Sequence, residues 1–422
     1  MNNYSSKIGV KNFILGLQHL LAMFGATVLV PLLTGLDISV ALFSAGVGTL
    51  IFHVCTKFKV PVFLGSSFAF IAPIVAVTQQ YGSVSYAQGG IFVAGCIYVL
   101  ASLLINKIGV DKIRRLLPGQ VVGPMIIVIG LNLVPVAIGN CKANIVIAVI
   151  TLVTAVGISK FAKGFIKQLN ILIAIILGYL LTFFFAPELV NSAVITNASW
   201  FKIPDFTFPK FDFGAIMMIA PIVLAVFMEH IGDITTNGQV VGKDFIKDPG
   251  LNRTLLGDGL ATMFAGCIGG PANTTYGENT GVLAMTKNYN PRNLEIAACF
   301  AIVLAFVGKV GGFLTSIPVP VMGGISLMLY CMISYVGFNT LRLEKVEFNP
   351  KNIIVIATIL IIGLYGTYLQ PFLGFDLAIK ITDNIAFGGL SLAALVGIIV
   401  NAILNGLSDN NIDADKLASA VE

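Results

Sequence analysis

Runs of about 17 to 25 apolar residues follow one another along almost the whole chain, separated by short stretches rich in Gly, Pro and charge. Each run is long enough to cross a bilayer core of roughly 30 Å as a helix. Fourteen such segments can be counted, and the first, Phe13–Leu33, is followed by further spans rather than by a soluble chain. The pattern predicts an all-α polytopic membrane protein with fourteen transmembrane segments.

Composition supports this prediction. Of 422 residues, 57% are apolar and only 11% are charged, and the mean hydropathy is +0.93. A soluble domain would carry roughly a quarter charged residues. The net charge of +5 is expected from basic residues that set orientation and contact lipid, so no nucleic acid partner is predicted. Six scattered cysteines without a CxxC pair are expected to be packing residues, and neither a metal nor a cofactor is expected.

Basic residues are unevenly divided between the two sets of loops. With the N-terminus on the inner side, the loops on that side hold 20 of the 25 Lys and Arg residues. Cytoplasmic loops carry the excess of basic residues in membrane proteins. An even number of crossings with both termini cytoplasmic is therefore predicted.

Fourteen segments divide into two halves of seven, and an odd number per half leaves the second half inverted relative to the first. Sequence echoes support this 7+7 inverted repeat. Gln18-His19 recurs as Glu229-His230, and the stretch Gly65–Phe68 recurs as Tyr276–Asn279, both at an offset close to 211 residues. Each echo is weak alone, but the shared offset indicates a common origin of the two halves.

Two segments at corresponding positions of this repeat are short and interrupted. They are the third (Phe63–Val77) and the tenth (Thr275–Lys287), both broken by small or turn-forming residues. Short interrupted segments at matching positions of two inverted halves mark the midplane binding site of a transporter. The substrate site is therefore predicted where these two segments meet.

Ionisable residues gather close to the tenth segment. Glu229 and Asp233 are four residues apart and share a helix face, and Asp258 and Glu278 follow within fifty residues. Carboxylates inside a span cost several kcal/mol and are functional candidates by default. Glu229 and Glu278 are predicted to contact substrate. Two alternatives stay open: Asp233 at a helix end, and Asp258 as a hydrogen-bonding residue between helices. His53 is expected near the membrane interface.

Broken helices and carboxylates together describe a substrate. Unpaired backbone N–H groups suit carbonyl oxygens, and carboxylates suit N–H donors. A small neutral molecule that presents both groups on one rim, stacked against Phe68 or Tyr276, fits this pattern, and a pyrimidine or purine base is such a molecule. Carboxylates in a low-dielectric site can bind and release protons, so Glu229 and Glu278 also predict proton coupling.

Two other classes of function fit the sequence less well. A site of carboxylates and broken helices without a ring of like charges favours occlusion, so a channel is only a remote alternative. The three histidines show no HExxH and no GxSxG accompanies them, so an enzyme is not predicted.

A set of motifs resembles the nucleobase/ascorbate transporter (nucleobase:cation symporter-2) family, and especially its bacterial uracil permeases. The family signature stands as Glu278-Asn279-Thr280-Gly281 with Thr286-Lys287, inside Asn273–Val282. The other stretches that agree are Gln18–Pro31, Gly65–Phe70, Lys247–Leu251 and Pro320–Gly324. The resemblance runs from about residue 12 to residue 405, and as a set these motifs are highly specific.

The resemblance implies two domains, each drawn from both halves. The core domain would hold residues 1–115 (segments 1–4) and 213–314 (segments 8–11), and the gate domain residues 116–190 (segments 5–7) and 315–407 (segments 12–14). Residues 191–212 would be an extracellular loop and 408–422 a cytoplasmic tail. Short antiparallel strands in segments 3 and 10 would meet at the midplane. Such relatives are proton symporters of the bacterial cytoplasmic (inner) membrane and often dimerise, so protons, the lipid bilayer and a second copy of the chain are expected partners.

By similarity, six residues would form the substrate site: Glu229, Glu278, Phe68, Gly277, Tyr276 and Ala26. The two glutamates would receive the N–H groups of uracil, and the backbone N–H groups of Phe68 and Gly277 would bind its carbonyls. The rings of Phe68 and Tyr276 would pack on the base, with Ala26 nearby.

Asp233 departs from the pattern of the uracil permeases, which usually have His at this position. Together with Asp258 it resembles the xanthine and urate branch, whereas the tenth segment keeps Glu278 in its uracil-type setting. Proton-coupled uptake of uracil is therefore the expected function, and proton symport of xanthine or another purine base is the alternative. Asp233 would take the coupling role of the usual His.

Overall fold

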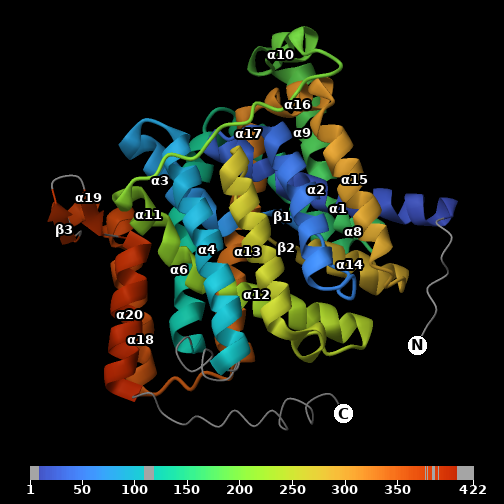
Figure 1. Ribbon diagram of the computed structural model, residues 1–422. Coiled ribbons are helices and arrows are strands. Elements are labelled where there is room, and N and C mark those ends of the chain that lie inside the picture. Colours follow the sequence, from blue (N-terminus) through green and yellow to red (C-terminus); the bar gives the residue numbers. More distant parts are fainter. Residues whose placement is uncertain are drawn as a thin grey trace.

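A computed structural model describes residues 9–108, 118–375, 377, 379–382, 385–387 and 389–405. The expected cytoplasmic tail at 408–422 lies outside these residues. In the described part the chain is mostly helical, with helices that stand roughly side by side around a short central pair of strands (Figure 1).

The first part of the chain forms the elements that lie before residue 200. They are α1 (Val10–Thr34), α2 (Ile38–Cys55), β1 (Leu64–Ser66), η1 (Phe68–Phe70), α3 (Ile71–Tyr81), α4 (Val84–Ile108), α6 (Gly119–Cys141), α7 (Ile145–Phe161), α8 (Phe165–Gln168), α9 (Asn170–Phe185), η2 (Pro187–Leu189) and α10 (Ser192–Asn197).

Elements after residue 212 repeat the same kinds of structure. They are α11 (Phe213–Ile219), η3 (Ala220–Ile222), α12 (Val223–Val241), η4 (Ile246–Gly250), α13 (Leu251–Ile268), β2 (Asn273–Thr275), α14 (Gly277–Thr286), α15 (Arg292–Ala305), α16 (Gly308–Thr315), α17 (Val319–Leu343), α18 (Pro350–Leu364), η5 (Tyr365–Leu369), α19 (Gln370–Leu373), β3 (Ile379–Thr382), β4 (Ile385–Phe387) and α20 (Gly389–Asn405).

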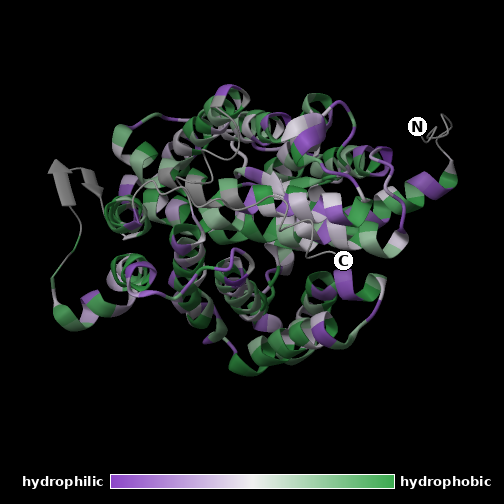
Figure 2. Cartoon of the chain, turned by 90° about the horizontal axis from the view of Figure 1, so that it is seen from below, coloured by the Kyte–Doolittle hydropathy of each residue, from purple (hydrophilic) through white to green (hydrophobic). Residues whose placement is uncertain are grey.

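Many helices are apolar on the outer surface as well as inside. Six in the described part are long and apolar enough to cross a membrane: Val10–Thr34, Ile38–Cys55, Val84–Ile105, Gly119–Cys141, Val319–Arg342 and Pro350–Leu373. Hydrophobic residues run along most of the helices in Figure 2, and Phe184 and Phe185 on α9 are 72% and 80% exposed. Such surfaces are stable in lipid rather than in water, so this is an integral membrane protein. The count of fourteen crossings stays a prediction.

Helix packing joins elements from the two halves of the chain. In one group α2 packs against α13 and α15, α4 against α13, and α1 against α15. In the other, α6 packs against α17 and α18, α7 against α17 and α9, and α18 against α20. Neither half therefore forms its own core. The assignment of these groups to a mobile gate and a substrate-carrying core stays a prediction.

A second strand pair lies in the fourteenth expected region, where only helix was predicted. β3 and β4 form an antiparallel hairpin with Ile379 opposite Phe387 and Lys380 opposite Ala386. Ile-Lys-Ile-Thr alternates apolar and polar residues with the period of a strand, but the alternation covers only four residues.

The stretch expected as an extracellular loop is an extended strap along one end of the molecule (Figure 1). Backbone N–H groups of Lys202, Thr207 and Lys210 donate to carbonyls near α15, α13 and α4. Asp212 ends the strap and caps α11 by accepting from the backbone N–H of Gly214 at 2.8 Å. A hydrogen bond from Tyr81 holds the pKa of the Asp212 carboxyl below its usual range. The strap is thus fixed at several points across the core helices.

Candidate functional site

Two three-residue strands, β1 and β2, pair antiparallel in the interior of the molecule (Figure 1). The pair is extended by backbone hydrogen bonds from Tyr276 to Phe63 (3.1 Å) and from Ser67 to Ala272 (2.8 Å). The register is Leu64 opposite Thr275, Gly65 opposite Thr274 and Ser66 opposite Asn273. The prediction that the broken third and tenth segments contain short antiparallel strands that meet is confirmed. Because the strands are antiparallel, the helices that follow them leave in opposite directions.

Close packing at Gly65 fixes the ring of Tyr276 against this strand pair. A Cβ at Gly65 would lie 2.3 Å from the Tyr276 ring and 2.8 Å from Thr27 Oγ1, so only glycine leaves room. The Tyr276 hydroxyl donates to the Ser66 carbonyl at 2.9 Å, and the Ser66 hydroxyl donates to the Thr27 carbonyl of α1 at 3.0 Å. α1, β1 and the start of α14 therefore form one rigid unit.

Three carboxylates from two helices gather beside β2. Glu229 and Asp233 on α12 and Glu278 in the first turn of α14 are all half-buried, and α12 packs against both β2 and α14. Glu229 and Glu278 are close enough to interact electrostatically, and Asp233 interacts with both. Asp233 also accepts a hydrogen bond from the Thr275 hydroxyl at 2.7 Å. The alternative that Asp233 sits at a helix end is wrong, because α12 continues to Val241.

Apolar side chains and one open backbone position also lie at the strand pair. Phe68 is half-buried and packs in the same cluster as Ala26 and Tyr276, which are both buried. Gly277 is exposed, and no heavy atom lies within 4 Å of a Cβ built on it. As the first residue of α14, Gly277 belongs to the turn whose N–H groups lack partners within the helix. The structure thus brings the predicted site residues into one region, while their roles in binding stay predictions.

Asp258 is paired with His230 and is not one of the three carboxylates beside β2. Its Oδ2 is 2.8 Å from His230 Nδ1, and both side chains are almost completely buried. The other ring nitrogen of His230 is 3.0 Å from Thr254 Oγ1. α12 and α13 are joined through this contact, which agrees with the alternative of Asp258 as a residue between helices.

Two asparagines that sequence reasoning left without a role hold the elements of the site together. Asn237, two turns beyond Glu229 on α12, donates to the Pro61 carbonyl at 3.0 Å and to Thr280 Oγ1 at 3.1 Å. Asn279 Nδ2 donates to the His19 carbonyl at 3.0 Å and is 3.2 Å from His19 Nδ1. The i+8 spacing to Glu229 is the one sequence signal that places Asn237 on the face of the carboxylates.

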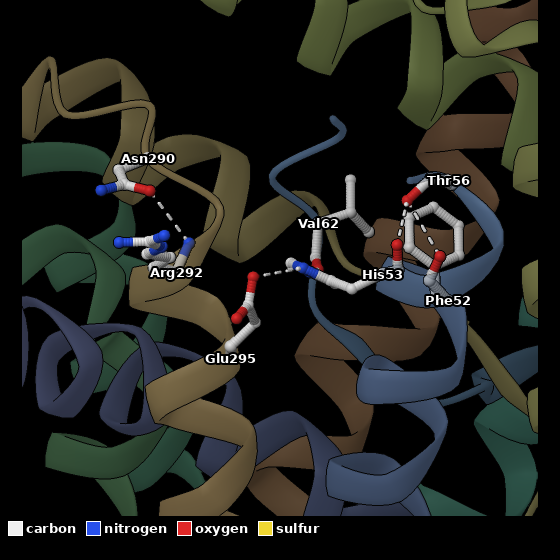
Figure 3. A network of polar contacts seen from close by, with 7 residues as sticks. All are labelled: Phe52, His53, Thr56, Val62, Asn290, Arg292 and Glu295. Carbon is white, nitrogen blue, oxygen red and sulfur yellow. Dashed lines mark hydrogen bonds and ion pairs between the residues drawn. The ribbon is translucent and has the colours of Figure 1, made fainter. Parts of the chain in front are cut away.

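His53 is fully buried in the last turn of α2, and the expectation that it lies near the membrane interface stays a prediction. Its Nε2 is 2.9 Å from the Val62 carbonyl, just before β1, and its Nδ1 is 3.4 Å from Glu295 on α15 (Figure 3). Arg292 and Asn290 lie in the turn beside Glu295. His53 therefore anchors the segment that leads into β1.

Comparison with known proteins identifies the family. A model described as "Permease family" (Xan_ur_permease) matches residues 10–372. The chain belongs to the nucleobase:cation symporter-2 family. It is 42% identical over 405 residues to a protein of Haemophilus influenzae named "Probable uracil permease", covering 94% of each chain. It is also 42% identical over 408 residues to the uracil permease of Bacillus caldolyticus, covering 93% of this chain and 91% of the relative. Membership of this family confirms the resemblance seen in the sequence motifs.

Among solved structures, the fold matches that of a murine anion transporter, Solute Carrier 26 family member A9, in its inward-facing state. The TM-score is 0.72 at 10% sequence identity, and the match covers 96% of this chain and 70% of that one. Such low identity shows the fold alone. The fold is that of a helical membrane transporter, and the family is described as one of permeases.

Proposed function

We propose that this permease takes up uracil across the bacterial cytoplasmic membrane by symport with protons. The single observation that carries this proposal is the convergence of Glu229 and Glu278 beside the exposed first residue of α14. Carboxylates accept the N–H groups of a neutral base, and the N–H groups at a helix start donate to its carbonyls. Relatives named uracil permeases support uracil as that base.

Proton coupling is proposed for the same carboxylates. Glu229, Asp233 and Glu278 lie within electrostatic range of one another, so placing three negative charges there is unfavourable. A proton that enters with the substrate removes one of these charges. Asp233 is proposed to carry that proton, because its contact with Thr275 links it directly to the strand pair.

Alternating access is proposed to move the two packing groups relative to each other. Residues 1–115 and 213–314 would form the core that carries the site, and residues 116–190 and 315–407 the gate. The site residues lie on α1, η1, α12 and α14, all within the proposed core. Both termini would be cytoplasmic, and a homodimer is proposed from the resemblance to the family.

Proton symport of xanthine is the second candidate, and Asp233 favours it. An aspartate at this position, hydrogen-bonded to Thr275, is the feature that resembles the xanthine and urate branch. The fused ring of a purine also presents N–H and C=O groups on one edge, so Glu229 and Glu278 would serve either base.

Uptake of radiolabelled uracil into proteoliposomes that hold the purified chain tests this proposal. The assay includes excess unlabelled xanthine as competitor and a proton ionophore in a parallel sample. Uptake that resists xanthine and is lost with the ionophore would support proton-coupled uracil transport. Uptake of xanthine without uracil would transfer the proposal to the purine base, and uptake that ignores an imposed pH gradient would rule out proton coupling.

A further inference from the structure

His230 and Asp258 form a polar pair that the proposed transport reaction does not use. His230 on α12 lies between two groups on α13: its Nδ1 is 2.8 Å from Asp258 Oδ2, and its Nε2 is 3.0 Å from Thr254 Oγ1. All three side chains are almost completely buried. Such a site holds its hydrogen bonds in fixed positions, so its protons can be counted.

The count of hydrogen atoms in this network starts at the Thr254 hydroxyl. Its single hydroxyl hydrogen is donated to the Leu251 carbonyl at 3.0 Å, so the oxygen must accept from His230 Nε2. A neutral imidazole carries only one N–H, and that hydrogen is now on Nε2. Nδ1 would then face Asp258 Oδ2 with a lone pair against a lone pair, 2.8 Å apart. One of these two groups must therefore hold a further proton, although no hydrogen bond of regular geometry joins Nδ1 to either carboxylate oxygen.

Either position of this proton leaves the pair neutral overall. It can sit on His230, giving an imidazolium beside a carboxylate, or on Asp258, giving two neutral groups. The opposite arrangement, with the Thr254 hydroxyl turned toward Nε2, would leave an ionised Asp258 without a counter-charge. That arrangement is unfavourable because no donor in the described part reaches Asp258 Oδ1 and the group is buried.

Neighbouring titratable groups oppose a bare negative charge at Asp258 as well. Glu229 of α12 interacts electrostatically with Asp258, and Asp233 interacts with His230. Tyr98 of α4 is also within electrostatic range of Asp258, but its phenol is neutral and adds no negative charge. Glu278 of α14 adds to the negative field around Glu229. An ionised Asp258 would therefore repel Glu229, whereas a neutral pair leaves Glu229 free to accept from substrate.

We propose that His230 and Asp258 share one proton that stays in place throughout transport, and that this neutral pair positions Glu229 by holding α12 against α13. His230 and Asp258 are positioning residues, distinct from the groups that exchange the coupled proton. The positioning role rests on the proposed uracil symport. The number of protons that His230 and Asp258 hold can be measured without transport.

Asp258→Asn is the decisive variant. The amide N–H of Asn would donate to His230 Nδ1, and the neutral imidazole would keep its bond from Nε2 to Thr254. The proton held by the pair is thereby replaced by an amide hydrogen, which is not released at physiological pH. Asp258→Ala is the matched variant that leaves Nδ1 without a donor.

Uptake and its pH profile in proteoliposomes distinguish a fixed proton from a transported one. We expect Asp258→Asn to keep the KM and maximal rate of uracil uptake within about twofold with an unchanged pH profile, and Asp258→Ala to lose about tenfold or more. Loss of net uptake in Asp258→Asn with exchange of labelled for unlabelled uracil retained would overturn the proposal, since the pair would then release its proton in each cycle. Parent-like uptake in Asp258→Ala would overturn the positioning role.

Nitrogen-15 NMR of histidine-labelled full-length protein shows which ring nitrogen of His230 carries a proton. This test depends neither on transport nor on the stability of Asp258→Ala. The chain has only three histidines, so single substitutions assign each ring. The parent should carry a proton on His230 Nε2, and Asp258→Asn should show the signals of the neutral Nε2–H tautomer. A parent spectrum with the proton on Nδ1 and none on Nε2 would contradict the count. If the parent carries no uracil at all, the proposed function fails while this measurement still stands.

Discussion

In both arms of the site a three-residue strand turns directly into a short helix, but the side chains that the two arms present are different. The first arm (β1, η1 and α3) contributes Phe68 and small residues, and at Gly65 it is packed so closely that a Cβ would overlap the Tyr276 ring. The second arm (β2 and α14) contributes Glu278, and Gly277 at its turn is open. The two arms therefore share a backbone pattern but present different groups: the first supplies the Phe68 ring and close packing, and the second supplies a carboxylate.

Removing the charge of the second arm should have the largest effect. Glu278→Gln is expected to lower uracil uptake by about 10- to 100-fold, because a hydrogen bond to a charged group contributes roughly 1.5–3 kcal/mol. Initial rates in proteoliposomes measure this effect. Glu188→Gln, an exposed carboxylate outside the site, is the control and should match the parent. Parent-like uptake by Glu278→Gln would show that the charge of the second arm is not needed for transport.

Filling the closed position of the first arm should disturb the fold itself. Gly65→Ala places a Cβ against the Tyr276 ring and Thr27, and such overpacking typically costs about 1–3 kcal/mol. We expect a lower Tm in detergent and broader elution from size exclusion. A stable Gly65→Ala protein with normal uptake would show that the tight packing is not required.

Filling the open position of the second arm should separate function from stability. Gly277→Ala adds a methyl group where no heavy atom lies within 4 Å, so the Tm should stay close to that of the parent. Uracil uptake should nevertheless fall by about severalfold, because the methyl group occupies the space where substrate approaches the helix start. The comparison with Gly65→Ala is made on the same preparations. An equal fall in Tm in both variants would contradict the difference between the arms.

Tyr276 joins the arms, and its hydroxyl should have the smallest effect. Tyr276→Phe removes the hydrogen bond to Ser66, which contributes about 1 kcal/mol, but keeps the ring over Gly65. We expect a fall of a few degrees in Tm with uptake near that of the parent. A large loss of uptake with an unchanged Tm would show instead that the hydroxyl contacts substrate.

Sequence reasoning located the site because its signals are local. Gly and Ser interruptions mark the two broken segments, and the spacing of Glu229 and Asp233 gives one helix face. It could not tell which surfaces pack together: helix periodicity says that Asn237 shares that face, but not that Pro61 and Thr280 lie opposite it. His53 shows the same limit, since Glu295, 3.4 Å from its Nδ1, is distant in sequence. The hairpin of β3 and β4 was missed because its alternation covers only four residues, which is too short to predict a strand.

The pairing of β1 with β2 also sets the order in which the site can be assembled. The Tyr276 hydroxyl and the Ser66 carbonyl that it binds are 210 residues apart, so β1 is synthesised long before its partner exists. Until then its backbone polar groups would be costly to leave bare in lipid, and the Thr49 hydroxyl, 2.9 Å from the Leu64 N–H, is the local partner that can cover one of them. A nascent chain that ends before β2 holds half a site with an unpaired strand edge. The first half must therefore enter the membrane before β1 and β2 can pair and complete the site.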